Sequence, residues 1–269
     1  MKQVIASRLI YACADWNVPG QINAELLKKF PSLLHLEDEL NASKSRGPAL
    51  THLQRYAQFL RGVEINSSFY RPHQAVTYAR WRDSVPDEFR FSVKLPKAIS
   101  HILRLKNCDV ELKKFVMEAA HLNEKLGCLL IQLPPSLSFD YHVAQRFFGL
   151  LKQLSHAPLA LEPRHATWFE AAVFDLLFGN DICLVAADPG IAGYEGLQED
   201  FPLTSSIAYL RLHGSPHMYR SSYEPAYLDK LALRIAALSA HCKHIWCVFD
   251  NTSEGAAFPN AITLQRQQT

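Results

Sequence analysis

Residues 159–169 read LALEPRHATWF, and this stretch decides the fold. An apolar run passes without a spacer into Glu162, Arg164 and His165. A loop on the surface usually separates a buried strand from charged residues by Gly, Ser or Asn. Charge that follows the strand directly is expected where a strand runs from a core into a pocket. Such a pocket forms where the carboxyl ends of parallel strands converge, as at the mouth of a β/α barrel.

The rest of the chain repeats this arrangement. The short apolar runs predict strands at residues 8–13, 63–66, 89–95, 128–133, 159–162, 182–186, 207–212 and 244–249. The amphipathic stretches between them predict helices at residues 51–60, 74–83, 110–125, 141–154, 168–178 and 225–240. Alternation of strand and helix about eight times predicts an α/β fold, a TIM-like (β/α)8 barrel in a single domain over residues 1–269.

A doubly wound open sheet is the alternative to the barrel. The chain has no G-x-G-x-x-G motif after an early strand and only 11 glycines, which disfavours a dinucleotide-binding fold. It therefore has no nucleotide-cofactor motif, and the sequence leaves the cofactor unknown. One segment interrupts the alternation: residues 17–50 are a predicted insertion after the first strand, with a helical pattern in AELLKKF (24–30). We expect the insertion to lie over one end of the barrel, with residues 41–48 as its most mobile part.

The overall composition gives no sign of a membrane or a nucleic-acid partner. The net charge is +2, and no apolar run is long enough to span a bilayer. Arg8 interrupts the apolar residues near the N-terminus, so a signal peptide is not expected. The six cysteines form no C-x-x-C pair, and several lie in apolar runs, which predicts reduced core residues in a cytoplasmic protein.

Polar residues alternate with apolar ones in several predicted strands. Tyr209, Arg211 and His213 share one face of their strand, because alternate residues of a strand point the same way. Glu64 in residues 62–68 and Lys94 in residues 91–95 follow the same pattern. The apolar faces must meet the helices, so we expect these polar side chains to point into the barrel.

The polar residues at the strand ends form the predicted site. We assign general acid/base roles to Glu64, Glu162 and His213 because carboxylate and imidazole groups transfer protons near neutral pH. We expect the substrate to be bound by Asn66, Lys94, Gln132, Arg164, His165, Arg211 and Asn251. The alternative is an ion network that fills the barrel and has no catalytic role, since the charges nearly cancel and buried charges must be paired.

The stretch FSVKLPKAISH (91–101) offers two cations to an anion. Lys94 and Lys97 could bind a phosphate or a carboxylate. Lys97 and His101 could equally lie in a solvated loop.

A divalent metal is a further possibility. Glu64, Glu162, Asp188 and His213 are ligand types for Zn, Mn or Mg. The chain has no H-x-H or H-E-x-x-H spacing, although ligands from different strands would leave no local signature. The nearby lysine and arginine residues favour an anionic ligand over a bare metal.

The motifs also resemble a known family. VEINSSFYR, FRFSVKLPKAISH, LLIQLPPSL, LEPRHATWF, YLRLHG and DNTSEGAAFPNA, in this order, look like the signatures of domain-of-unknown-function family 72, the YecE-like proteins. The resemblance implies a TIM-barrel fold, wide bacterial occurrence and no established activity. It also implies that the predicted site residues cluster. The chain departs from the family at ACADW (12–16), where glycines are common, and at Asp250, where Asn is common.

Three functions follow from this pattern. The first is an enzyme that binds an anionic small molecule, bearing phosphate or carboxylate, and acts on it by acid/base chemistry. The second is a metal-dependent phosphodiesterase acting on nucleic acid, which near-neutral charge disfavours. The third is a binding protein for a nucleotide or metabolite without catalysis. The sequence does not predict the oligomeric state.

Overall fold

The computed structural model describes residues 8–19, 24–45, 50–191, 193–194 and 198–268. Across these residues the strands form one parallel sheet in the order β6-β5-β4-β3-β2-β1-β9-β8-β7. The strands are β1 (Arg8–Cys13), β2 (Gly62–Ile65), β3 (Arg90–Lys94), β4 (Leu126–Gln132), β5 (Leu159–Glu162), β6 (Ile182–Leu184), β7 (Ala186–Asp188), β8 (Ile207–Leu212) and β9 (His244–Phe249). Parallel neighbours in nearly sequential order are what repeated strand–helix units produce.

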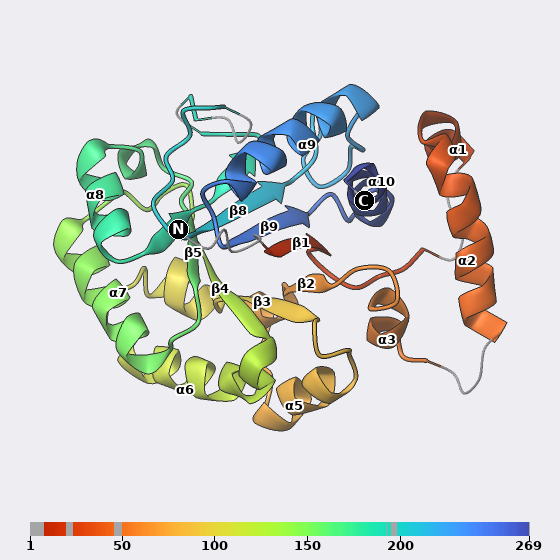
Figure 1. Cartoon of the computed structure of the whole chain (residues 1–269). Coiled ribbons are helices and arrows are strands. Elements are labelled where there is room, and N and C mark those ends of the chain that lie inside the picture. Colours follow the sequence, from red (N-terminus) through yellow and green to blue (C-terminus); the bar gives the residue numbers. More distant parts are fainter. Residues whose placement is uncertain (1–7, 20–23, 46–49, 192, 195–197, 269) are drawn as a thin grey trace, which may run out of the picture.

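The sheet curls into a nearly closed barrel surrounded by helices (Figure 1). The predicted sixth strand, residues 182–186, is divided into β6 and β7, which are separated only by Val185. β6 pairs with β5 and β7 pairs with β8, so this divided segment joins the two ends of the sheet. The TIM-like barrel is confirmed, and the prediction of one uninterrupted sixth strand is wrong.

Helices follow the strands as predicted, with differences at their ends. The α-helices are α1 (Ala24–Lys29), α2 (Leu34–Ser45), α3 (His52–Tyr56), α4 (Ser67–Tyr70), α5 (Ala75–Asp83), α6 (Asp109–Ala119), α7 (Tyr141–Leu154), α8 (Ala171–Gly179), α9 (Pro225–Ser239) and α10 (Ala257–Gln267). Shorter helical turns are η1 (Pro31–Leu33), the π-helical η2 (Ala98–Ile102), η3 (Ala120–Lys125) and η4 (Ala166–Trp168). α7 begins after Asp140, whose side chain accepts a hydrogen bond from the Val143 amide at 3.2 Å.

Three predicted helices are shorter than expected. The helix predicted for residues 110–125 ends as α6 at Ala119, and residues 120–125 form the 3₁₀ segment η3. The helix predicted for residues 51–60 ends at Tyr56, and hydrogen bonds to the third preceding residue continue the chain through Phe59 as turns. The helix predicted for residues 168–178 begins only at Ala171, because residues 166–168 form a separate 3₁₀ turn capped by His165.

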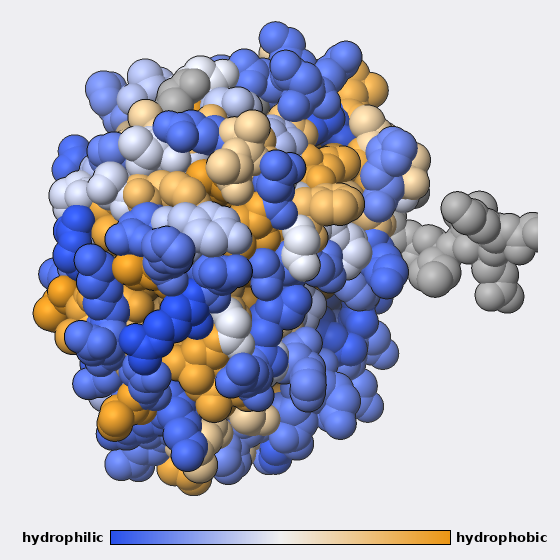
Figure 2. All heavy atoms as spheres, turned by 90° about the vertical axis from the view of Figure 1, so that its left-hand side faces the viewer, coloured by the Kyte–Doolittle hydropathy of each residue, from blue (hydrophilic) through white to orange (hydrophobic). Residues whose placement is uncertain are grey.

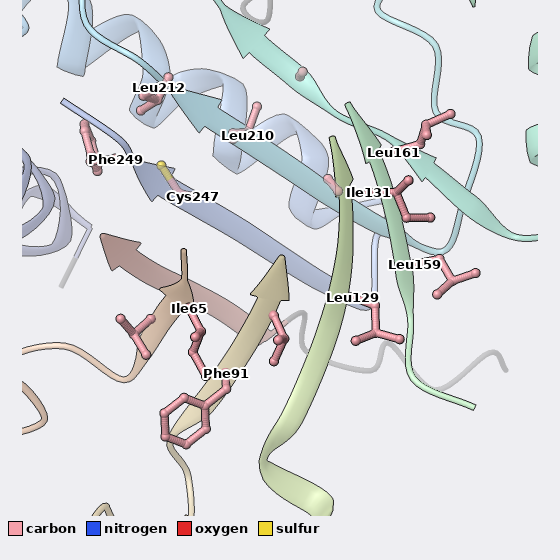
Figure 3. Close-up of a cluster of buried hydrophobic side chains, with 14 of the residues drawn as sticks. Ile65, Phe91, Leu129, Ile131, Leu159, Leu161, Leu210, Leu212, Cys247 and Phe249 are labelled. Carbon is pink, nitrogen blue, oxygen red and sulfur yellow. The ribbon is translucent and has the colours of Figure 1, made fainter. Parts of the chain in front are cut away.

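The main core lies between the outer face of the barrel and the helices. Alternate strand residues point outward into this layer (Figure 3). Among them are Ile65, Phe91, Leu129, Ile131, Leu159, Leu161, Leu210, Leu212, Cys247 and Phe249. All six cysteines are free and buried, as predicted. The apolar faces therefore meet the helices, and the remaining strand residues face the lumen.

The amino-terminal half of the lumen is apolar. Trp246 fills its base, and the Tyr209 ring stacks on it with centroids 5.9 Å apart. Two neighbouring strands have a glycine where they pack against this indole. A Cβ on Gly127 would lie 2.6 Å from Trp246 Cζ2, and a Cβ on Gly62 would overlap Ile10. The packing of one large side chain thus requires small residues on the neighbouring strands.

The insertion after β1 lies beside the barrel, next to α10 (Figure 1). The predicted helix in AELLKKF is present as α1. An ion pair joins Lys29 to Glu224, at the start of α9, and Arg266 Nη2 lies 3.1 Å from Glu39 Oε2. Residues 41–45 belong to α2, whereas residues 46–48 of the stretch expected to be mobile lie outside the described residues.

The surface is mixed in character. The face in Figure 2 is mostly hydrophilic, with smaller hydrophobic areas between the polar side chains. None of the helices in the described part of the chain is long and apolar enough to cross a membrane.

Replacement of Gly62 by Ala tests the packing at the base of the barrel. We expect the free energy of unfolding to fall by about 1–3 kcal/mol, because the new methyl group must displace Ile10 or Trp246. Gly149→Ala is the control: it lies in α7 with no heavy atom within 4 Å of the added methyl group, and should raise stability by up to about 1 kcal/mol. Urea titration compares the two variants, and equal stabilities would contradict this packing.

Candidate functional site

The carboxyl-terminal half of the lumen holds a cluster of charged side chains. Each comes from the lumen face at or just after the end of a strand, where alternation places polar residues inward. The buried members are Glu64 of β2, Lys94 of β3, Glu162 of β5, Arg211 of β8, and His213 and Asp250, which follow β8 and β9.

Arg211 is the centre of this cluster and is fully buried. Its Nε and Nη2 atoms donate to the two oxygens of Glu64 at 3.0 and 2.7 Å, a bidentate pair. Its Nη1 donates to Glu162 Oε2 at 3.0 Å. Its Nη2 also lies 3.0 Å from Asp250 Oδ2. One guanidinium therefore links three carboxylates from three strands.

Tyr209 supports this cluster from below. Its hydroxyl lies 2.8 Å from Glu64 Oε2 and 2.9 Å from Ser92 Oγ. The single O–H can donate to the carboxylate while the oxygen accepts from Ser92. Burial and the Glu64 charge hold the pKa of Tyr209 well above its ordinary value, so the hydroxyl remains a donor. Tyr209 thus joins the apolar base of the lumen to its charged half.

His213 lies between two carboxylates. Its Nδ1 is 2.9 Å from Asp250 Oδ2, and its Nε2 is 3.0 Å from Glu162 Oε1. The side chain is fully buried, and the ring of Tyr219 packs edge-on against it at 5.5 Å. An imidazole held at both nitrogens by carboxylates has a fixed orientation, which proton transfer requires.

Burial opposes ionisation of the carboxylates, but the neighbouring guanidinium groups and hydrogen bonds outweigh it. Arg211, Arg164 and His213 keep the pKa of Glu162 well below its ordinary value despite burial. Arg211 and His213 likewise lower the pKa of Asp250 against the effect of burial. Both groups are therefore ionised at neutral pH.

Three other predicted residues border this cluster. Arg164 forms an ion pair with Glu162 and also contacts His213 Nε2. Gln132 Nε2 donates to Glu162 Oε1 at 3.4 Å. Asn66 Nδ2 donates to the Ala14 carbonyl at 3.2 Å, and its buried Oδ1 has no hydrogen-bond partner in the described structure.

Lys94 differs from the other buried cations. It is 6% exposed, and its ammonium forms no hydrogen bond or ion pair with any described residue. Its Nζ lies over the Phe69 ring, 4.4 Å from the centroid. Burial and the nearby Arg211 lower the pKa of Lys94 to about 8, despite the nearby carboxylates. This cation lacks the oxygen partners that a buried ammonium normally has.

A pocket of about 900 Å³ opens above the cluster at the carboxyl ends of the strands. Lys94, Asn66, Gln132, Arg164 and Asp250 line it, so four predicted binding residues share one cavity. Its rim includes residues of the loops after β2, β3 and β8, namely Phe69, Tyr70, Lys97, His101, Met218 and Tyr219. Its position is that of the active site in β/α barrel enzymes.

Three predicted residues have partners outside this pocket. His165 caps η4, with Nδ1 2.9 Å from Thr167 Oγ1. Asp188 accepts a hydrogen bond from the Tyr223 hydroxyl at 2.6 Å.

Asn251, the third predicted residue with partners outside the pocket, donates to the Ser221 carbonyl at 2.9 Å and to Asn260 Oδ1 at 3.0 Å. It anchors the chain that follows β8.

Two residues of the cluster were not among the predicted catalytic or binding residues. Asp250 contacts both Arg211 and His213 and lines the pocket, but it was not among the predicted catalytic or binding residues. Its place at the end of a strand was the available signal. Tyr209 shares a strand face with Arg211, and this alternation was the signal for its role.

The structure supports a metal site less than the sequence did, because the candidate ligands are paired with other groups. Within residues 8–268, apart from the undescribed gaps, no group of three or more His, Cys, Asp or Glu side chains is arranged to hold a metal ion. Of the candidate ligands, Glu64 and Glu162 have their oxygens paired with Arg211, and Asp188 is bonded to Tyr223.

The comparison with known proteins identifies the family. The family described as "Protein of unknown function DUF72" matches residues 41–269. The chain belongs to this family. UPF0759 protein YunF of Bacillus subtilis is 23% identical over 238 residues, covering 77% of this chain and 83% of YunF. UPF0759 protein YecE of Escherichia coli is 34% identical over 85 residues, covering 32% of this chain and only 31% of YecE. The resemblance seen in the sequence motifs is confirmed.

Solved structures of DUF72 proteins share the fold. The Thermotoga maritima protein superposes with a TM-score of 0.75 at 21% identity, over 97% of this chain and 98% of that chain. An Enterococcus faecalis protein gives a TM-score of 0.73 at 18% identity, over 97% and 95% of the two chains. At these identities the likeness shows the fold alone, and the family description names no activity.

Replacement of Arg211 by Met tests whether this residue holds the cluster together. We expect the free energy of unfolding to fall by about 3–5 kcal/mol at neutral pH, because three carboxylates lose their shared cation. In the intact protein the pKa values of Glu162 and Asp250 are lowered, so their stabilising contribution is lost as the pH falls below about 4. The deficit of the variant should therefore be largest near neutral pH and narrow on acidification.

Urea titrations at several pH values measure this difference. The exposed Arg80→Met variant, on α5, is the matched control and should change stability little at any pH. A deficit for Arg211→Met that is small, or that does not change with pH, would contradict its assignment as the shared cation.

Proposed function

We propose that this protein is an enzyme that binds a small molecule carrying an oxyanion group at the mouth of the barrel and transfers a proton on it. The observation that carries this proposal is Lys94, a largely buried side chain whose ammonium reaches the pocket without forming an ion pair with any described residue. Leaving a buried charge unpaired is unfavourable, so a ligand that supplies a carboxylate or phosphate oxygen would be bound strongly there.

The remaining charges support the same assignment. Arg211 is already saturated by three carboxylates, and Arg164 is paired with Glu162. Arg211 is therefore not free to neutralise a ligand, whereas Arg164 lines the pocket and uses only its Nη2 in the contacts with Glu162 and His213. The anion-binding role is therefore assigned chiefly to Lys94, with Lys97 at the rim and Arg164 in the same lining.

The acid/base chemistry is assigned to His213 and its carboxylate partners. His213 lies behind Asp250, which lines the pocket and has its Oδ2 2.9 Å from Nδ1. A proton can pass between the ligand and the imidazole through this carboxylate. Glu162, 3.0 Å from Nε2, stabilises the charge that develops on the ring. Glu64 is fully engaged with Arg211 and Tyr209, which favours a positioning role over the predicted catalytic one.

The two other functions receive less support. A metal-dependent phosphodiesterase needs several free carboxylate or imidazole ligands side by side. Of the pocket's carboxylates, Asp250 is paired with Arg211, and no group of three or more such side chains in the described part of the chain is arranged to hold a metal ion. A binding protein without catalysis would share the Lys94 site, and it differs from the enzyme only in whether the ligand is consumed.

Incubation of the protein with small carboxylates, sugar phosphates and nucleotides in D₂O tests the proposal. Proton NMR of each compound detects both product formation and deuterium incorporation. We expect at least one compound to react and to raise the melting temperature of the protein. Lys94→Met should lose the rise in melting temperature, whereas His213→Gln should retain it and lose at least about 100-fold in turnover.

The outcomes separate the alternatives. Binding without any chemical change would replace the enzyme by a binding protein. A shift in melting temperature that needs a divalent metal would favour the phosphodiesterase. If Lys94→Met binds the ligand as well as the original protein does, Lys94 is not the anion site and the proposal fails.

A further inference from the structure

One wall of the pocket carries three groups that can be positively charged. Lys94 lies at the end of β3, Lys97 follows the strand, and His101 lies in the π-helical turn η2. Neither Lys97 nor His101 forms an ion pair with a described residue. The pocket's carboxylates, Asp15 and Asp250, come from other strands. This wall therefore concentrates positive charge beyond the single ammonium considered above.

The backbone holds these groups in place with an unusual element. Residues Ala98–Ile102 form a π-helical turn, a rare element that is frequently found at functional sites. It places Lys97, at its N-cap, and His101 in the lining of one pocket. The chain here follows directly from the strand that carries Lys94, so the spacing of the three groups is fixed locally.

Phe69 forms a common support for two of them. The Lys94 ammonium lies 4.4 Å from its ring centroid, and the His101 ring packs edge-on at 4.9 Å. Phe69 is itself fixed through Ser68, whose Oγ lies 2.7 Å from the Lys94 carbonyl and 2.9 Å from the Ile65 carbonyl. The lysine and the imidazole are thus held side by side by a buried aromatic ring.

The imidazole of His101 has one nitrogen available to a ligand. Its Nδ1 lies 2.9 Å from Ser100 Oγ, and its Nε2 has no hydrogen-bond partner among the described residues. When Ser100 donates to Nδ1, the proton of the neutral ring is on Nε2, which is then a donor. Burial, followed by the charges of Lys94 and Lys97, lowers the pKa of His101, and an anion bound between these groups would oppose that effect.

We infer that this wall is a site for a doubly charged oxyanion, so that the substrate is a phosphate monoester, with the phosphoryl group held by Lys94, Lys97 and His101. This inference rests on the proposed function and names its substrate class. A carboxylate carries one charge and two oxygens, which Lys94 alone can satisfy. A phosphoryl group carries up to two charges and three oxygens, which match two ammonium groups and an imidazole N–H.

Sulfate and acetate distinguish the two cases, because sulfate has the shape and double charge of a phosphoryl group and acetate is a single carboxylate. Calorimetric titration of the whole chain at pH 7 and constant ionic strength gives both affinities. We expect sulfate to bind at least about tenfold more tightly than acetate. Lys97→Ala and His101→Gln should each weaken sulfate about tenfold and leave acetate nearly unchanged.

Two exposed residues away from the pocket supply matched controls. Lys113→Ala, on α6, and His156→Gln, after α7, remove the same groups and should leave both affinities unchanged. They exclude a general effect of protein charge, which acts on any anion.

The outcomes also separate this inference from the proposed function. Equal affinities for sulfate and acetate, both lost in Lys94→Met, would overturn the phosphate site and leave the single-anion site in place. Unchanged sulfate affinity in both Lys97→Ala and His101→Gln would overturn it as well. Binding of neither anion, or equal binding in Lys94→Met, would overturn both proposals.

Discussion

The pairing of Arg211 with three carboxylates is the constraint on which the rest of the site depends. A guanidinium that is fully buried must have its donors satisfied, and here Glu64, Glu162 and Asp250 do so from β2, β5 and the end of β9. These strands are far apart in the sequence and meet only because the sheet closes on itself. Two of the same carboxylates, Glu162 and Asp250, orient His213, so the interaction that neutralises the lumen also sets the geometry of the proposed acid/base groups.

The sequence left two interpretations of the lumen charges open, a structural ion network and a functional site, and the structure supports them at different depths of the barrel. Near Tyr209 the charges are paired and closed to solvent, as a structural network requires. Toward the mouth, Lys94 has no partner among the described residues, and Asp250 and Arg164 border an open pocket. Because the paired groups use up the available carboxylates, Lys94 is left without one. The saturated network below thus leaves the unpaired cation on which the proposed anion-binding site rests.

Much of the fold and part of the site could be predicted from the sequence. Period-two alternation placed Tyr209, Arg211 and Glu64 inside the barrel, since the faces of a strand are set locally. The partners of a side chain could not be predicted, because they depend on the register of distant strands. Asp188 ends a strand like the others but faces Tyr223, and His165 caps a turn next to Arg164. The division of the sixth strand at Val185 also arises only when both ends of the sheet must be paired.

The pKa of Lys94 is the measurement that tests most directly whether this cation awaits an anion. Carbon and nitrogen NMR shifts of isotopically labelled lysine, assigned with Lys94→Met, give this pKa with and without saturating sulfate. A value near 8 in the free protein that rises when sulfate binds is the predicted result, since an anion stabilises the ammonium. A value near the ordinary 10.5 that sulfate does not change would mean that Lys94 is already satisfied, and the assignment of the pocket would be wrong.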